Sequence, residues 1–169
     1  MGLAVSRDGG QRFRDQHLSA WDFTADAVLV RCPRCAHCAK VVVKPGTPTT
    51  EHPVRSPRRL ACGRCGCVRD ARDPVRFGPA SPGIVRDPFL RQPLWLQTDF
   101  DGQVLWAYNE RHLDYLEAYV AARLREGYLT ANHARIWMAM ADRLPTWLKA
   151  ANNRERILRS IARLRTSLN

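Results

Sequence analysis

The chain has 169 residues, and its 27 lysine and arginine residues outnumber its 16 aspartate and glutamate residues to give a net charge of +11. No apolar run approaches the roughly 20 residues that a membrane-spanning helix needs, and the first 21 residues are too polar for a secretory signal. We therefore expect a cytoplasmic protein with reduced thiols. A basic chain favours polyanionic partners, either nucleic acid or an acidic protein surface.

Residues 1–27 form a polar leader that we expect to be mobile or lightly docked, with Phe13, Trp21 and Phe23 as its aromatic anchors. Strands are predicted at residues 28–30 and 39–44 and from residue 60 onward, because β-branched and other apolar residues cluster there. Residues 45–57 contain four prolines and are expected to form a loop.

Two short cysteine motifs, C-P-R-C and C-G-R-C, are separated by 26 residues. Each motif allows a tight turn that points two sulfurs at one position, and two such turns provide the four thiolates of a tetrahedral structural zinc site. The predicted ligands are Cys32, Cys35, Cys62 and Cys65. Four protein ligands leave no open position on the metal, so this pattern predicts a structural site and not a catalytic one.

The two motifs and their flanks resemble a zinc ribbon, a small module with a three-stranded antiparallel sheet and two metal-binding knuckles. Zinc ribbons occur in transcription factors, polymerase subunits, ribosomal proteins and proteins of replication or repair. The resemblance covers residues 28–69 and implies a ribbon around one zinc ion, and we expect the ribbon domain to span residues 28–73. Gly66 matches the family pattern after the second cysteine of a knuckle, whereas Ala36 stands where the family usually has glycine.

The remaining cysteines, Cys38 and Cys67, leave alternatives open, because either could replace a named ligand. Cys32, Cys35 and Cys38 also match the first three cysteines of a bacterial ferredoxin run, but Val42 stands where the fourth cysteine would be. A third alternative is a set of reduced or disulfide-bonded cysteines that bind no metal.

Positive charge is concentrated on the predicted ribbon, since residues 31–76 carry eleven basic residues against three acidic ones. Arg34 and Arg64 occupy equivalent positions in the two motifs, and Arg58 and Arg59 precede the second motif. We expect these four arginines to contact nucleic-acid phosphates. The alternative is that charged residues on so small a module simply face solvent.

Residues 74–93 are rich in proline and glycine and are predicted to form an extended linker. Residues 94–169 then form the second part. Apolar runs at 94–97 and 104–108 flank an Asp-Gly turn and predict a β-hairpin. Helical periodicity predicts helices at about 110–126 and 131–143 and a last helix after residue 152. The chain is therefore expected to be α+β.

Three stretches of the second part, at residues 93–98, 105–109 and 144–154, resemble uncharacterised bacterial proteins that join a ribbon to a small helical domain. This resemblance implies an architecture and no activity. Glu110, Asp114 and Glu117 share a helix face and could serve a metal-dependent nuclease, but they are more simply explained as the solvated side of an amphipathic helix. The last helix has a basic face that could contact phosphates or an anionic membrane, or could remain in water.

Together these patterns indicate a non-enzymatic, zinc-stabilised nucleic-acid-binding protein. One alternative is an adaptor that docks on an acidic protein of the transcription or replication machinery. The other is a metal-dependent, nuclease-like enzyme.

Overall fold

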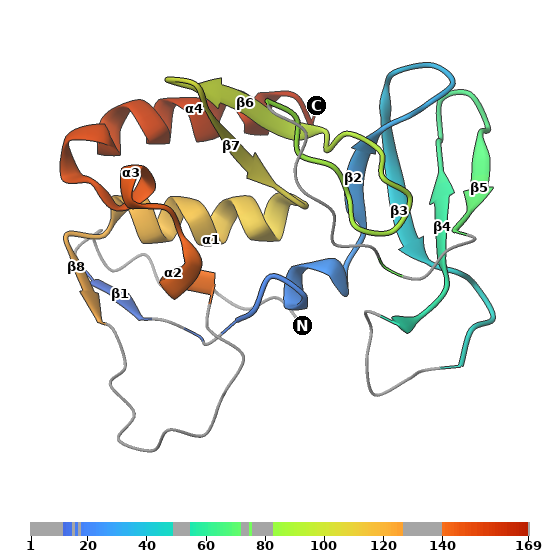
Figure 1. Cartoon of the computed structure of the whole chain (residues 1–169), viewed down its shortest axis with the longest axis horizontal. Coiled ribbons are helices and arrows are strands. Elements are labelled where there is room, and N and C mark those ends of the chain that lie inside the picture. The colour runs from blue at the N-terminus through green and yellow to red at the C-terminus, as the bar shows by residue number, and fades with distance from the viewer. Residues whose placement is uncertain are drawn as a thin grey trace.

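Two groups of secondary-structure elements make up the described chain, which comprises residues 12–14, 16, 18–48, 55–71, 75, 83–126 and 140–168 of a computed structural model. One group is a four-stranded antiparallel sheet, and the other is a two-stranded hairpin packed on helices (Figure 1). The expectation of an α+β protein is therefore confirmed.

The four-stranded sheet contains β2 (Val28–Arg31), β3 (Cys38–Val43), β4 (Arg58–Ala61) and β5 (Val68–Asp70), in that spatial order. The register pairs Val28 with Val41 and Val41 with Leu60, so these three apolar side chains line one face and are fully buried. The predicted sheet lacked β5, whose residues are exposed and carry no apolar periodicity.

The predicted hairpin is confirmed as β6 (Leu96–Phe100) and β7 (Gln103–Ala107). Its turn residues, Asp101 and Gly102, have φ angles of 51° and 77°. Two consecutive positive φ angles are the geometry that an Asp-Gly pair favours in a tight hairpin turn.

Helix α1 (Glu110–Ala121) begins at Asn109, whose side chain accepts a hydrogen bond from the backbone N–H of His112. The prediction that this helix extends to residue 126 is wrong. The chain leaves the helix at Ala122 and forms β8 (Leu124–Glu126), which pairs in parallel with β1 (Arg12–Arg14).

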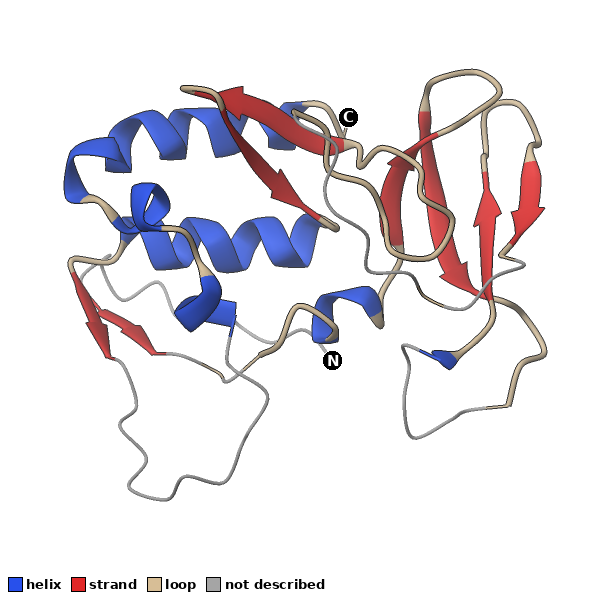
Figure 2. Ribbon diagram, viewed as in Figure 1, coloured by secondary structure: helices blue, strands red, loops and turns tan. Residues whose placement is uncertain are grey.

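The remaining helices are α2 (Met140–Arg143), α3 (Thr146–Lys149) and α4 (Arg154–Thr166), and single 3-10 turns lie at Asp22–Thr24 and Ala151–Asn153. Most of the helix predicted at 131–143 lies outside the described residues. Helices α1 and α4 pack against each other, and the hairpin contacts both of them (Figure 2). Among the described helices, none combines the length and the apolar character that a bilayer crossing requires.

The described part of the leader is packed into the core, which corrects the expectation of a lightly docked segment. Phe13 contacts the rings of Tyr115 and Tyr119 edge-on at 5.3 and 5.2 Å. Phe23 has no exposed surface, and its carbonyl oxygen accepts a hydrogen bond from the side chain of Asn109. Aromatic burial of this size stabilises the leader against the helices.

The described end of the predicted linker, residues 83–93, is likewise packed and not extended. The carboxylate of Asp87 accepts hydrogen bonds from the backbone N–H groups of Phe89, Leu90 and Gln92, which closes a tight loop. Phe89 is buried in the same cluster as the apolar face of the four-stranded sheet. This loop joins the two groups of elements, because Leu94 follows it and bridges to Val30 of β2.

Candidate metal centre and the surrounding charge

The two cysteine motifs form matching turns at one end of the four-stranded sheet, in the connections from β2 to β3 and from β4 to β5 (Figure 1). In the first, the carbonyl oxygen of Cys32 accepts a hydrogen bond from the backbone N–H of Ala36 at 2.9 Å; in the second, that of Cys62 accepts one from Gly66 at 3.0 Å. We call these turns the knuckles. Ala36 and Gly66 both have a left-handed backbone, with φ angles of 59° and 67°.

The knuckles bring together the four predicted ligand sulfurs, since the Sγ atoms of Cys32, Cys35, Cys62 and Cys65 all lie within 4.8 Å of one another. The Cys32–Cys65 and Cys35–Cys62 sulfur pairs are 3.7 and 3.6 Å apart. Tetrahedral coordination with metal–sulfur bonds of about 2.3 Å places the sulfurs about 3.8 Å apart, whereas a disulfide needs about 2.05 Å. The donor set therefore fits one tetrahedral metal ion.

Backbone N–H groups surround the sulfurs and act on their protonation. Burial would raise the pKa of Cys32, but hydrogen bonds, the strongest from the N–H of Cys35, outweigh it and lower the pKa to about 6. The N–H of Cys65 lowers the pKa of Cys62 in the same way. The N–H of His37 lowers the pKa of Cys35, but burial and the adjacent thiols raise it to about 12. Without metal the site holds protons that a bound cation would displace.

The two other cysteines lie outside this group of sulfurs. Cys38 is half-buried and packs against the core of the second group of elements, and Cys67 follows the second knuckle. No disulfide joins any of the six cysteines. Because Cys38 is not among the clustered sulfurs, the geometry disfavours the ferredoxin-like alternative.

The knuckle arginines, Arg34 and Arg64, are both exposed. Within the described chain neither side chain has an ion pair. Arg59 differs, since it forms a two-pronged ion pair with Asp70 at 2.6 and 3.0 Å, and Lys44 contacts the same carboxylate at 2.9 Å. The hydrogen bond from Arg59 holds the pKa of Asp70 well below its usual range.

The structure corrects the placement of Arg58, which is only 1% exposed and cannot contact a phosphate from that position. Its guanidinium donates a hydrogen bond to the carbonyl oxygen of Thr24 and stacks on the ring of Phe89. The strand alternation contained this information, because Arg58 lies two residues before the buried Leu60 and so shares its face.

Three carboxylates of α1 that could have served a nuclease surround one arginine of α4. Arg165 contacts Glu110, Asp114 and Glu117 at 3.5, 2.7 and 2.6 Å. These carboxylates form no metal-binding cluster; within the described residues the four cysteines are the group that does. The three acidic side chains thus connect α1 to α4.

The ion pairs of Asp70 and Arg165 were not predicted from the sequence. Each of these residues pairs with side chains of another secondary-structure element. Neither has a local signal of its role. The pairing of Asp70 with Arg59 could have been found by extending the sheet to a fourth strand, because cross-strand register places the two residues opposite each other. No protein-family model matches this chain, and comparisons with curated proteins and with solved structures give no match.

Proposed function

We propose that this protein is a zinc-stabilised nucleic-acid-binding protein whose cysteine knuckles form a zinc ribbon and present Arg34 and Arg64 to phosphates. The observation that carries the proposal is the position of these two arginines. They occupy the same place in two facing knuckles, are exposed, and lack ion pairs among the described residues. Arginine is suited to phosphate because its planar group donates two parallel hydrogen bonds.

The chemistry of the site supports a structural metal. Four thiolate ligands fill a tetrahedral shell and leave no position for water or substrate, so the metal would hold the knuckles in place and take no part in a reaction. Zinc is the expected ion because four thiolates in a reduced compartment favour it, although a single iron shares this geometry. Exposed basic residues beside the knuckles, Arg31, Lys40 and Arg69, would extend the phosphate-facing surface.

Metal analysis of purified protein and of two cysteine variants tests the ligand set. Cys62→Ser should lose the metal, because three thiolates and a hydroxyl bind zinc far more weakly than four thiolates do. The end of the sheet that carries the knuckles should then unfold. The matched control, Cys38→Ser, should retain one equivalent of metal. Full metal content in Cys62→Ser would refute the assignment, and a coloured, iron-containing protein would change the ion but not the ligands.

Fluorescence-anisotropy titrations against single-stranded DNA, duplex DNA and structured RNA test the binding. Each phosphate contact with a single strand contributes about 0.7 to the slope of log affinity against log salt, so Arg34→Gln/Arg64→Gln should lower the slope by about 1.4. Arg123→Gln/Arg143→Gln removes the same charge from exposed positions outside the ribbon and should leave the slope almost unchanged.

Binding to none of these nucleic acids at low salt would refute the proposal. An acidic protein partner would then become the better interpretation of the basic knuckles, because the same exposed arginines can pair with carboxylates. That interpretation predicts that the protein binds polyglutamate, as a model of an acidic partner. Arg34→Gln/Arg64→Gln should weaken this binding, and the control Arg123→Gln/Arg143→Gln should not.

A further inference from the structure

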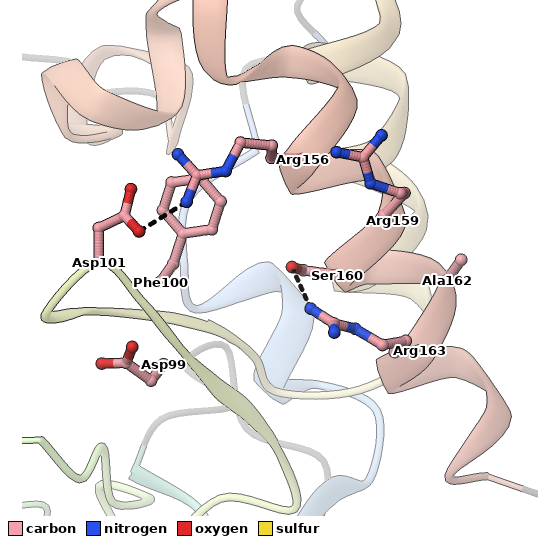
Figure 3. A pocket seen from close by; sticks show the side chains of 8 residues that line it. All are labelled: Asp99, Phe100, Asp101, Arg156, Arg159, Ser160, Ala162 and Arg163. Carbon is pink, nitrogen blue, oxygen red and sulfur yellow. Dashed lines mark hydrogen bonds and ion pairs between the residues drawn. The ribbon is translucent and has the colours of Figure 1, made fainter.

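A second basic surface lies far from the knuckles, where the hairpin turn meets the outer face of α4. An open pocket of about 490 Å³ lies there. Its lining comes from two elements, the hairpin at residues 99–101 and helix α4, which contributes Arg156, Arg159, Ser160 and Arg163 (Figure 3). The metal centre shares none of these residues.

The three arginines of this pocket differ in what they already bind. Arg156 donates a hydrogen bond to the carboxylate of Asp101 at 2.6 Å and stacks on the ring of Phe100, so its charge is neutralised. The carboxylate nearest to Arg159 is that of Glu155, 3.9 Å away, and both side chains are mostly exposed. An exposed pair at that distance contributes little. Arg159 is thus available to a ligand.

Arg163 is held in place by a neutral group. Its guanidinium donates a hydrogen bond to the hydroxyl oxygen of Ser160 at 3.0 Å, and Ser160 itself is 2% exposed. A buried hydroxyl orients the arginine without cancelling its charge. Arg159 and Arg163 come from successive turns of one helix face, where β-carbons lie about 5–6 Å apart. The mostly exposed side chain of Arg159 is long enough to reach a ligand that Arg163 binds.

We propose that Arg159 and Arg163, with Ser160 as the positioning residue, bind a phosphate group in this pocket. Two arginine forks supply charge-assisted hydrogen bonds that match the tetrahedral oxygens of phosphate. The opposite wall does not cancel them, because Asp101 is paired with Arg156 (Figure 3). Among the described lining residues, Asp99 is then the one carboxylate left to oppose the two positive charges of Arg159 and Arg163. The phosphate belongs either to a nucleic-acid backbone or to a small phosphorylated molecule; only the first source rests on the function proposed above.

The test uses the full-length, metal-loaded protein and follows the arginine Nε–Hε signals by NMR during titration with inorganic phosphate at constant ionic strength. The signals of Arg159 and Arg163 should shift and saturate, whereas those of Arg123 and Arg143 should not. Ser160→Ala keeps both charges and favours helix, yet should reduce the shift at Arg163 because the guanidinium loses its anchor. Arg159→Gln/Arg163→Gln should abolish saturable binding. An absence of saturable shifts in the wild-type protein would overturn the proposal.

A salt series with a single-stranded oligonucleotide separates the two sources. If the backbone supplies the phosphate, Arg159→Gln/Arg163→Gln lowers the salt slope by about 1.4 while Arg123→Gln/Arg143→Gln does not. If the slope is unchanged but inorganic phosphate still saturates the pocket, the source is a small phosphorylated molecule. Arg34→Gln/Arg64→Gln should retain the phosphate shifts of Arg159 and Arg163 in either case, so failure of the knuckle proposal is distinguishable from failure of this one.

Discussion

The guanidinium of Arg58 donates a hydrogen bond to the carbonyl oxygen of Thr24, 2.7 Å away, across 34 residues of sequence. The guanidinium carbon Cζ lies over the Phe89 ring, 4.2 Å from its centre. Through these contacts one side chain of β4 joins the leader and the loop at residues 83–93 to the four-stranded sheet. An arginine buried in this way is a structural residue, even though the sequence places it in a basic cluster.

Replacing Arg58 with methionine should therefore destabilise the protein and not specifically weaken the proposed nucleic-acid binding. Methionine retains much of the apolar packing but leaves the Thr24 carbonyl without this donor, which should lower the free energy of unfolding by about 1–3 kcal/mol. Urea denaturation at saturating metal measures the loss. Arg55→Gln, at an exposed position, is the control and should change stability little. Equal stability of the two variants, with weaker nucleic-acid binding in Arg58→Met alone, would contradict the structural role. It would indicate that the Arg58 side chain is exposed and contacts phosphate.

Local patterns predicted the parts of this fold that local geometry determines. The knuckles follow from cysteine spacing, and the hairpin follows from an Asp-Gly pair between β-prone runs. Several of the failures involve contacts between distant segments. Burial of Phe13 against Tyr115 and of Phe89 against the sheet depends on tertiary packing, which no window of sequence contains. Composition suggested a linker at 83–93, but Asp87 satisfies three backbone N–H groups and makes a packed loop there.

Ala36 should be a point of strain that glycine relieves. Its φ of 59° places a β-carbon in the left-handed region, which costs about 1–2 kcal/mol for an L-residue. Ala36→Gly should raise the free energy of unfolding by about 0.5–1 kcal/mol, because the greater freedom of glycine in the unfolded chain offsets part of the gain. Thermal unfolding at saturating metal measures the change.

Gly66 provides the matched reverse experiment, since it holds the same place in the second knuckle with a φ of 67°. A β-carbon added there meets no atom within 4 Å, so Gly66→Ala changes backbone conformational energy and not packing. It should lower stability by about 1 kcal/mol. Changes of the same sign in both variants would contradict the view that the two knuckles are conformationally equivalent.

His112 should make the stability of the protein depend on pH. Its ring has no exposed surface, stacks on Phe23 at 4.4 Å, and accepts a hydrogen bond from the backbone N–H of Tyr108. Burial lowers the pKa of His112 to about 3, whereas an unfolded histidine has a pKa of about 6.5. Between these values the unfolded state binds more protons, so stability is full above pH 6.5 and falls as the pH decreases toward 3.

The effect can be isolated by comparing pH profiles between pH 7.5 and 5. One proton taken up on unfolding gives a slope of up to about 1.4 kcal/mol per pH unit, which His112→Gln should remove. Loss of metal at low pH affects both proteins, so the difference between their profiles reports His112. Parallel profiles for wild type and His112→Gln would show that the histidine does not titrate on unfolding.

Arg165 should stabilise the contact between α1 and α4 because it forms ion pairs with three carboxylates. Arg165→Gln leaves Glu110, Asp114 and Glu117 on one helix face without the cation that holds them together. Because all four groups remain partly exposed, solvent screening limits the expected loss to about 1 kcal/mol at low ionic strength. The loss should shrink as salt increases, because salt screens interactions between exposed charges. Denaturation of Arg165→Gln and of the control Arg143→Gln at 20 and 500 mM salt measures it. A loss that is independent of salt would indicate that Arg165 acts by packing its aliphatic stem between the helices, and not through its charge.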